Sequence, residues 1–295
     1  MTNNAKRASS DLPRDDRILP TTKVALIIVV PFLALAFLTL YFFPERTGDR
    51  FAWAIKPAMT ALFIGAGYLG GGYQFVRLIF GRKWHRYGMA FPPVMTFTVA
   101  MLAATLLHWD RFDIHHLPFQ LWLILYIITL FLITWLWWTN RRTDPVAPEP
   151  GDPLLPRGAN FAFGALGVVT LLAAMTVFVK PQLAIGVWSW SLTPLTARVL
   201  AGWFALMGVG SLVLARERRW SACRVALQSF MLWHGLVLAG AFWHVEDFGK
   251  RGLMNGYVVA TVTGLAGMGA LYLLMEARSR RMASKSPGAT AHAQG

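Results

Sequence analysis

Two short motifs in this sequence combine an imidazole with a carboxylate at the same spacing. His108 and Asp110 are separated by one residue, and so are His244 and Glu246. Imidazole nitrogens and carboxylate oxygens are ligands that Zn²⁺ takes in proteins, usually four of them in a tetrahedron. If the fold brings the two motifs together, two nitrogens and two oxygens converge on one divalent metal ion. An open coordination position would activate a water for catalysis, whereas a closed one would only join the two segments.

A second interpretation of these motifs needs no metal. Both motifs come directly after long apolar segments, where polar side chains are common because the chain is leaving the membrane. Arg111 is adjacent to Asp110 and can pair with it. The sequence therefore leaves open whether these residues bind an ion or form a polar rim.

His234 is the one histidine near the middle of a long apolar segment, and Gln228 precedes it in the same segment. Ionisable side chains are expensive inside a membrane and often mark a function. A haem would normally need a second axial ligand at similar depth, and the sequence offers no other histidine there, which disfavours haem. The alternative is a histidine that is hydrogen-bonded to a neighbouring helix. No aspartate or glutamate lies at mid-segment, so the carboxylate relay of ion-coupled transporters is missing.

Arg198 lies one turn inside the apolar segment that begins at Pro194. A helix N-terminus carries partial positive charge, so together they can bind an anion such as a lipid headgroup. Trp53 and Trp190 precede Pro57 and Pro194 by four positions each, and tryptophan is typical of the depth of lipid headgroups. Equally, the arginine can extend to the membrane surface and the tryptophans can serve only as anchors.

The composition indicates a membrane protein. The chain of 295 residues is 56% hydrophobic and only 14% charged, against roughly 25% charged residues in an average soluble domain. Eight apolar segments are each long enough, as a helix of about 20 residues, to cross a bilayer. They comprise residues 24–43, 57–80, 87–107, 117–138, 160–179, 195–215, 223–243 and 253–275. Thr193 and Pro194 supply an N-cap and a first residue for one of these helices. We expect an all-α, polytopic membrane protein with eight transmembrane helices.

The net charge of +14 is distributed in a pattern that indicates topology. Most of the lysines and arginines fall in the two chain ends and in alternate connections between the apolar segments. The positive-inside rule then places both termini in the cytoplasm of a protein of the cell membrane. Because this pattern explains the basic surplus, the partner it implies is the lipid bilayer and not nucleic acid.

The two halves of the sequence match each other. The matched pairs are Pro44 with Pro181, Trp53 with Trp190, Pro57 with Pro194, Trp84 with Trp220, His108 with His244 and Phe112 with Phe248. The members of each pair are 136 or 137 positions apart. A biased composition would mainly match leucine with leucine, so these residues favour an internal duplication.

The duplication predicts how the chain is organised. Its expected parts are a disordered cytoplasmic tail (1–22), a four-helix repeat (23–139), a proline-rich cytoplasmic linker (140–158), a second four-helix repeat (159–276) and a disordered basic tail (277–295). An even number of helices returns the chain to its starting side, so both repeats insert in the same orientation. The expected symmetry is a pseudo-twofold axis along the membrane normal.

Three classes of function fit this organisation. The first is a non-catalytic protein that binds a lipid-like ligand or a partner subunit between its repeats. The second is a transporter or facilitator that uses the repeat interface. The third is a metal-dependent membrane enzyme with its site at His108, Asp110, His244 and Glu246. The sequence favours the first, without identifying the ligand.

Overall fold

The computed structural model describes residues 14–249 and 251–284, and this part of the chain is helical without β-strands. Its long helices are α2 (Pro20–Phe42), α4 (Ala58–Ile79), α5 (Phe91–Leu107), α6 (Leu117–Asn140), α7 (Arg157–Val179), α9 (Pro194–Arg216), α10 (Trp220–Trp243) and α11 (Arg251–Ser284). Each overlaps one of the apolar segments identified in the sequence. Shorter helical turns follow the long helices, among them η1 (Pro44–Arg46), α3 (Thr47–Arg50) and α8 (Gln182–Ile185).

Seven of these helices are long and apolar enough to cross a membrane, which makes this an all-α membrane fold. The remaining long helix, α4, has 22 residues but is less apolar, because it contains several glycines, two tyrosines and a glutamine. Most of its side chains are buried against the rest of the protein. By contrast, α7 and α11 expose most of their apolar side chains. Lipid contact therefore falls mainly on the peripheral helices.

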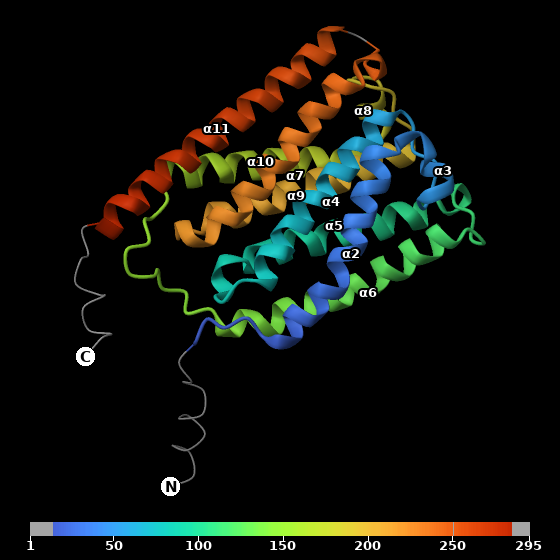
Figure 1. Ribbon diagram of the computed structural model, residues 1–295. Coiled ribbons are helices and arrows are strands. Elements are labelled where there is room, and N and C mark those ends of the chain that lie inside the picture. The colour runs from blue at the N-terminus through green and yellow to red at the C-terminus, as the bar shows by residue number, and fades with distance from the viewer. Residues whose placement is uncertain (1–13, 250, 285–295) are drawn as a thin grey trace.

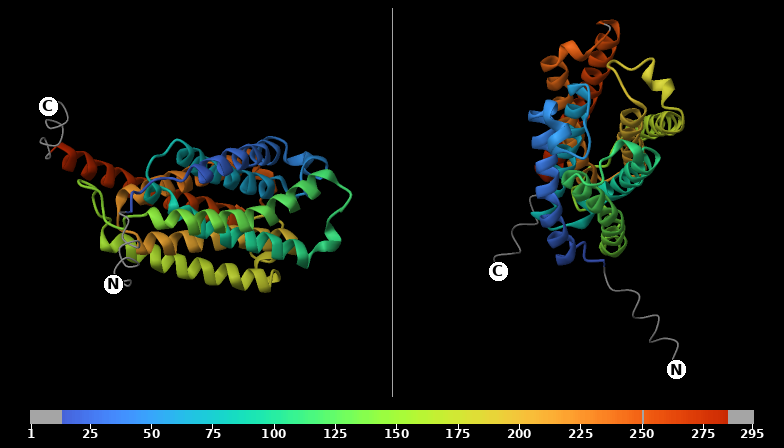
Figure 2. Two further views of the ribbon diagram at one scale, coloured as in Figure 1. Left: turned by 90° about the horizontal axis from the view of Figure 1, so that it is seen from below. Right: turned by 90° about the vertical axis from the view of Figure 1, so that its right-hand side faces the viewer.

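The long helices form an elongated bundle in which α2 begins and α11 ends at the same end (Figures 1 and 2). Helix α4 packs against α2 and α10, whereas α9 packs against α7 and α5. Helices α6 and α11 pack on the outside, against α5 and α10 respectively. Consequently α5 lies beside α9 of the second half, and α10 lies beside α4 of the first half.

Close packing joins α4 and α9 near the middle of the bundle. A β-carbon added to Gly67 of α4 would lie 2.5 Å from the ring of Trp203 on α9, so only glycine permits this approach. Gly208 of α9 faces Leu171 of α7 in the same way, with an added β-carbon 2.9 Å from the Leu171 nitrogen. Small residues at such contacts are the usual means by which membrane helices pack tightly.

The helix starts follow the local sequence. Pro194 is in the first turn of α9, and the Thr193 side chain accepts a hydrogen bond from the Thr196 N–H, which confirms the expected N-cap. The start of α4 is satisfied from the other half of the chain, since the Asp247 carboxylate accepts a hydrogen bond from the Met59 N–H at 2.7 Å.

The chain ends differ in part from the sequence expectation. Residues 14–19 pack against the bundle, where Ile18 is buried, and helix α2 already starts at Pro20. Helix α11 continues past residue 276 to Ser284. The rest of the two expected tails, residues 1–13 and 285–295, lies outside the described residues.

Candidate functional site

The two predicted His-x-acid motifs follow α5 and α10 and begin short 3-10 turns, η4 (Trp109–Arg111) and η6 (Val245–Asp247). Asp110 pairs with Arg111 at 3.2 Å, and His244 Nδ1 lies 3.4 Å from the Glu246 carboxylate. Among the described residues one group of three or more potential ligands has its atoms within 4.8 Å, and it contains none of the four predicted ligands. The structure therefore does not gather the two motifs around a common point.

His108 has a cationic partner. The Arg198 guanidinium donates from Nη1 to His108 Nε2 at 2.7 Å, and from Nε to the Phe178 carbonyl at 2.9 Å. Burial and the positive charge of Arg198 both lower the pKa of His108. Arg198 thus ties α9 to the ends of α5 and α7, and its hydrogen bonds go to protein atoms.

Trp53 and Trp190 are buried rather than displayed at the surface. They are 7% and 2% exposed. Each packs edge-on against a phenylalanine, Trp53 on Phe112 with ring centroids 5.7 Å apart and Trp190 on Phe248 at 5.5 Å. The Trp190 indole also donates to Thr60 Oγ1 at 2.8 Å. Neither ring is placed to touch a lipid headgroup, because other rings cover them, Phe112 and Trp122 on Trp53, and Phe248 and Tyr257 on Trp190.

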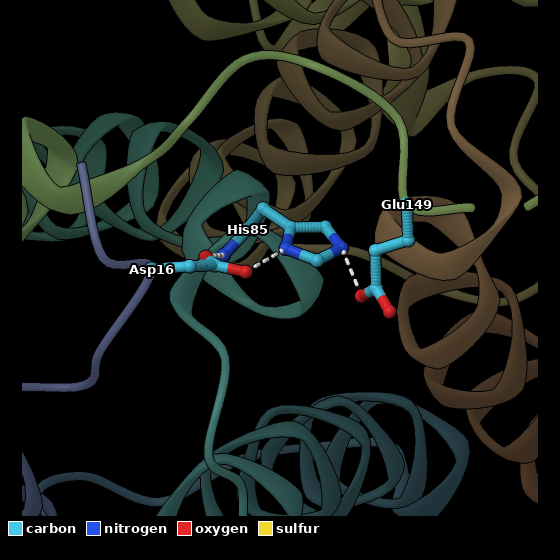
Figure 3. Close-up of side chains that lie close together, drawn as sticks. All are labelled: Asp16, His85 and Glu149. Carbon is cyan, nitrogen blue, oxygen red and sulfur yellow. Dashed lines mark hydrogen bonds and ion pairs between the residues drawn. The ribbon is translucent and has the colours of Figure 1, made fainter. Parts of the chain in front are cut away.

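A buried polar cluster that the sequence analysis did not identify lies at the opposite end of the bundle (Figure 3). Its centre is His85, in the turn η2 (Trp84–Arg86), with a side chain that is fully buried. His85 Nδ1 is 2.5 Å from the Asp16 carboxylate, and Nε2 is 3.1 Å from the Glu149 carboxylate and 2.9 Å from Ser221 Oγ. The Ser221 hydroxyl in turn donates to Asp152 Oδ2 at 2.6 Å.

The order Asp16, His85, Ser221 resembles that of a hydrolase triad, but the protons are placed differently. A triad serine gives its proton to the histidine. Here the Ser221 hydroxyl donates to Asp152, so its oxygen is left to accept from His85 Nε2. Because the His85 side chain is fully buried, no substrate can reach it. The cluster is built to hold segments together rather than to react.

Asp16, His85 and Glu149 are also the one group in the described chain with the geometry of a metal site. However, Glu149 already binds two cations, Lys83 at 2.8 Å and Arg86 at 2.9 Å. Although partial burial opposes ionisation, these hydrogen bonds and charges lower the pKa of Glu149. A metal ion would have to displace both cations, so an ion-paired network describes this cluster better.

The proline-rich linker crosses the same end of the bundle and is bound on both sides. Asp144 pairs with Arg219 at 2.7 Å, and Arg219 also binds Glu217 at 2.7 Å. Burial opposes the charge of Asp144, but the hydrogen bonds from Arg219 and the Val146 N–H, together with nearby positive charge, outweigh it and lower the pKa of the carboxyl. Asn140 is fully buried, with its amide oxygen accepting from Leu19 N–H and Thr22 Oγ1. We call this part of the chain, residues 140–156, the strap.

A first cavity lies within the apolar part of the bundle, between α2, α4, α5 and α6, with α9 and α10 completing its wall. It has a volume of about 180 Å³. We call it the Gln74 cavity, after one of the residues that line it, Gly71, Gln74, Thr98, Trp122, Tyr126 and Trp203. Gln74 and Trp203 are 5% and 3% exposed, and neither Gln74 Nε2 nor Trp203 Nε1 has a hydrogen-bond partner.

The second cavity lies between α7, α9, α10 and α11 and measures about 480 Å³. We call it the His234 cavity; its lining includes Trp188, Phe204, Ser211, His234, Tyr257 and Gly264. His234 Nδ1 is 2.8 Å from the Phe230 carbonyl one turn earlier in α10. In the alignment of the two halves His234 corresponds to Thr98, and each of the two lines one cavity.

Gln228, the other polar residue predicted within this segment, does not line either cavity. Its amide oxygen accepts from Tyr73 and Arg77, and its amide nitrogen donates to Tyr272, at 2.7–3.0 Å. These bonds link α10 to α4 and α11, so Gln228 is satisfied by protein partners.

Comparison of the chain with protein-family models, with curated proteins and with solved structures found no match. The functional conclusion therefore depends on the geometry of these sites.

Proposed function

We propose that this protein binds a lipid-like ligand inside the bilayer, in the Gln74 cavity. The observation that carries the proposal is a set of buried N–H donors without a hydrogen-bond partner, on Gln74, Trp122 and Trp203, whose side chains line a mainly apolar cavity. Leaving such a group unpaired costs about 1–3 kcal/mol. A ligand with a hydrogen-bond acceptor, such as a carbonyl or ester oxygen, would remove that cost.

The walls of the Gln74 cavity fit the rest of such a ligand. Trp122 and Tyr126 face each other with ring centroids 4.3 Å apart, and Phe97 packs on Trp203 at 4.1 Å. Ligand pockets are typically apolar and aromatic, with a few polar groups that fix orientation. An apolar chain or ring with one acceptor matches this lining.

Access from the lipid side supports the same proposal. Phe32 of α2 lines the cavity and is still 39% exposed on the outside of the bundle. Helix α6 contributes Leu125 and Thr129 to the lining and otherwise presents apolar side chains to its surroundings. A ligand dissolved in the bilayer can therefore enter sideways between α2 and α6 without crossing water.

The proposal includes eight membrane spans, and α4 is the span that other helices shield from lipid. Its glycines and polar residues meet protein rather than lipid, since α2 and α10 pack along it. We place both termini and the strap on the cytoplasmic side of the cell membrane, because the basic residues concentrate there.

The proposal also treats the two halves as parallel repeats. The main helix contacts have counterparts when the two halves are exchanged. The contact α2–α4 corresponds to α7–α9, and α5–α6 corresponds to α10–α11. The contact α5–α9, which joins the halves, corresponds to α10–α4. The edge-on ring pairs Trp53 with Phe112 and Trp190 with Phe248 recur as well, at interplanar angles of 77° and 78°. Both patterns support a pseudo-twofold axis between α4 and α9.

Transport through the repeat interface is less favoured. Gly67 and Trp203 are in tight contact there, and Trp233 Nε1 donates to the Phe63 carbonyl at 3.2 Å. These residues form part of the cavity walls, with Gly67 and Trp203 in the Gln74 cavity, Phe63 in the His234 cavity and Trp233 in both. A metal-dependent enzyme at His108 and His244 is less favoured too, since Arg198 occupies His108 Nε2.

The test is photolabelling with an acceptor-bearing probe, the methyl ester of a diazirine-bearing sixteen-carbon fatty acid. Purified protein in lipid nanodiscs is irradiated, and labelled peptides are located by mass spectrometry. We expect label on α2, α5 and α6 at residues facing the Gln74 cavity. Gly71→Phe should abolish it, because Gly71 lines the cavity and an added β-carbon there meets no atom within 4 Å.

Two glycines provide matched controls. Gly264→Phe places the same side chain in the His234 cavity, and Gly235→Phe places it on α10 outside both cavities; both sites also lack atoms within 4 Å of an added β-carbon. Labelling of the Gln74 cavity should survive both changes. Labelling confined to outward-facing residues, or unaffected by Gly71→Phe, would contradict the proposal.

A further inference from the structure

We infer that the His234 cavity is a second binding site, selective for an apolar molecule that carries a hydroxyl group. The inference rests on the proposed function in one respect, that both cavities lie within the bilayer. Its own basis is the hydrogen bonding of His234, which differs in kind from that of Gln74 and Trp203.

The backbone fixes which nitrogen of His234, a residue of the cavity lining, is left as an acceptor. The Phe230 carbonyl can only accept, so Nδ1, 2.8 Å away, carries the proton. The apolar surroundings disfavour a charged imidazolium. The neutral ring then keeps a lone pair on Nε2, for which the described residues provide no donor. An acceptor without a donor in an apolar cavity calls for a ligand that donates a hydrogen bond.

The other lining residues narrow the ligand to an uncharged alcohol or phenol. None of the described residues that line this cavity carries a full charge, so nothing there compensates a carboxylate or a phosphate. The indole Nε1 of Trp188 also lacks a partner and is a donor. A hydroxyl group can both donate to His234 and accept from an N–H, whereas a ketone or an ether can only accept.

The size and the access of the cavity suit such a molecule. Its volume of about 480 Å³ falls within the roughly 300–1,000 Å³ of typical ligand pockets. Trp188, Phe204 and Tyr257 supply aromatic walls. Leu166 of α7 lines the cavity and is 56% exposed on the outside of the bundle, so entry is again from the lipid side.

The equivalent position in the other half shows why the two cavities differ. Thr98 Oγ1 donates to the Val94 carbonyl of its own helix at 2.8 Å, so this position offers the Gln74 cavity a hydroxyl oxygen where the other cavity has an imidazole nitrogen. Conversely, Gln74 aligns with Ser211 in the match of the two halves, so the His234 cavity has a short hydroxyl side chain where the Gln74 cavity has a long amide. Both cavities therefore have unpaired N–H donors in their lining, and the His234 cavity adds the lone pair of an imidazole nitrogen.

Two probes that differ only in whether the terminal oxygen carries a hydrogen or a methyl group test the inference. They are a diazirine-bearing sixteen-carbon alcohol and its methyl ether, applied separately to the protein in nanodiscs. At limiting concentration, we expect the alcohol to label α7, α10 and α11 around the His234 cavity about two- to tenfold more than the ether, the range one net hydrogen bond supplies. Equal labelling by the two probes in the wild type, or no labelling there by either, would overturn the inference without any variant.

Variants locate the effect. His234→Phe should reduce the alcohol to the level of the ether, while Gly264→Phe should remove both signals and Gly71→Phe should leave both intact. A preference for the alcohol that survives His234→Phe would also overturn the inference. The ester probe in the same samples reports the Gln74 cavity separately, so failure of one site is distinguishable from failure of the other. Elution as a single monodisperse species on gel filtration confirms that each variant is folded.

Discussion

His85 Nε2 lies 2.9 Å from Ser221 Oγ, and these two residues occupy corresponding positions in the two halves of the chain, 136 apart. Their carboxylate partners, Asp16 and Asp152, are 136 apart as well. Each aspartate binds both the backbone N–H and the side chain of one residue. For Asp16 this residue is His85, at 2.9 Å and 2.5 Å respectively. For Asp152 it is Ser221, at 2.9 Å and 2.6 Å. One hydrogen-bonded chain thus runs from the first half to the second.

Removing the serine hydroxyl should weaken this connection. In Ser221→Ala, Asp152 loses a donor and His85 Nε2 loses an acceptor, and we expect the free energy of unfolding to fall by about 1–3 kcal/mol. Thermal unfolding in detergent measures it. Ser284→Ala is the matched control, because that exposed hydroxyl bonds only the Arg281 carbonyl of its own helix. Equal effects of the two substitutions would argue against a role for the chain in stability.

Glu149 should make stability depend on acid pH. Its pKa is lowered from 4.5 because Lys83 and Arg86 favour the carboxylate, which outweighs the effect of burial. The unfolded chain therefore takes up this proton at a higher pH than the folded protein does. The contribution is present in full above pH 4.5 and is lost as pH falls through the lower, folded pKa. The Glu149→Gln variant should unfold at a lower temperature than the wild type at neutral pH, and it should lose less stability than the wild type on acidification. Plots of unfolding temperature against pH that run parallel for the two proteins would contradict this.

Asp144→Asn should weaken the attachment of the strap to the start of α10. The Arg219 side chain is 8% exposed and would keep only Glu217 as a carboxylate partner. Hydrogen bonds to charged groups contribute about 1.5–3 kcal/mol, so we expect a loss in that range. The control is Asp15→Asn, whose ion pair with Arg17 is mostly exposed and should contribute less than about 1 kcal/mol. Chemical unfolding of both variants provides the comparison.

Gly67→Ala should disturb the contact between α4 and α9. The added methyl group would lie 2.5 Å from Trp203, so the helices or the indole must move. Overpacking of this kind typically costs about 1–3 kcal/mol. Gly71→Ala on the same helix adds the same group where no atom lies within 4 Å, so it should be nearly neutral. A melting temperature unchanged in Gly67→Ala would show that the helices can separate freely here.

The long helices were predictable because length and apolarity are local properties. The start of α5 illustrates the limit: the apolar segment begins near residue 87, but a 3-10 turn (Gly88–Ala90) comes first and the α-helix starts at Phe91. Likewise, Trp53 and Trp190 stand at segment ends in the sequence, where tryptophan usually meets headgroups. They are buried because rings far away in the sequence, Phe112 and Phe248 among them, pack on them.

The sites were less predictable, because they depend on which helices become neighbours. His108 and Arg198 were each identified from the sequence, but their bond requires α5 to pack on α9 of the other half. His85 was not identified at all, since its partners are far away in the sequence. One signal was present: Asp16 and Asp152 match at the same offset as Trp84 and Trp220.

The crossed pairing of α5 with α9 and of α10 with α4 has a consequence for how the protein is made. During synthesis α4 is made well before α9 and α10 exist. Its glycine-rich surface must remain uncovered, or be covered by something else, until most of the chain has been made. The first half therefore has no complete native core of its own, and quality control of the nascent protein has to tolerate an exposed, less apolar helix until the second half arrives.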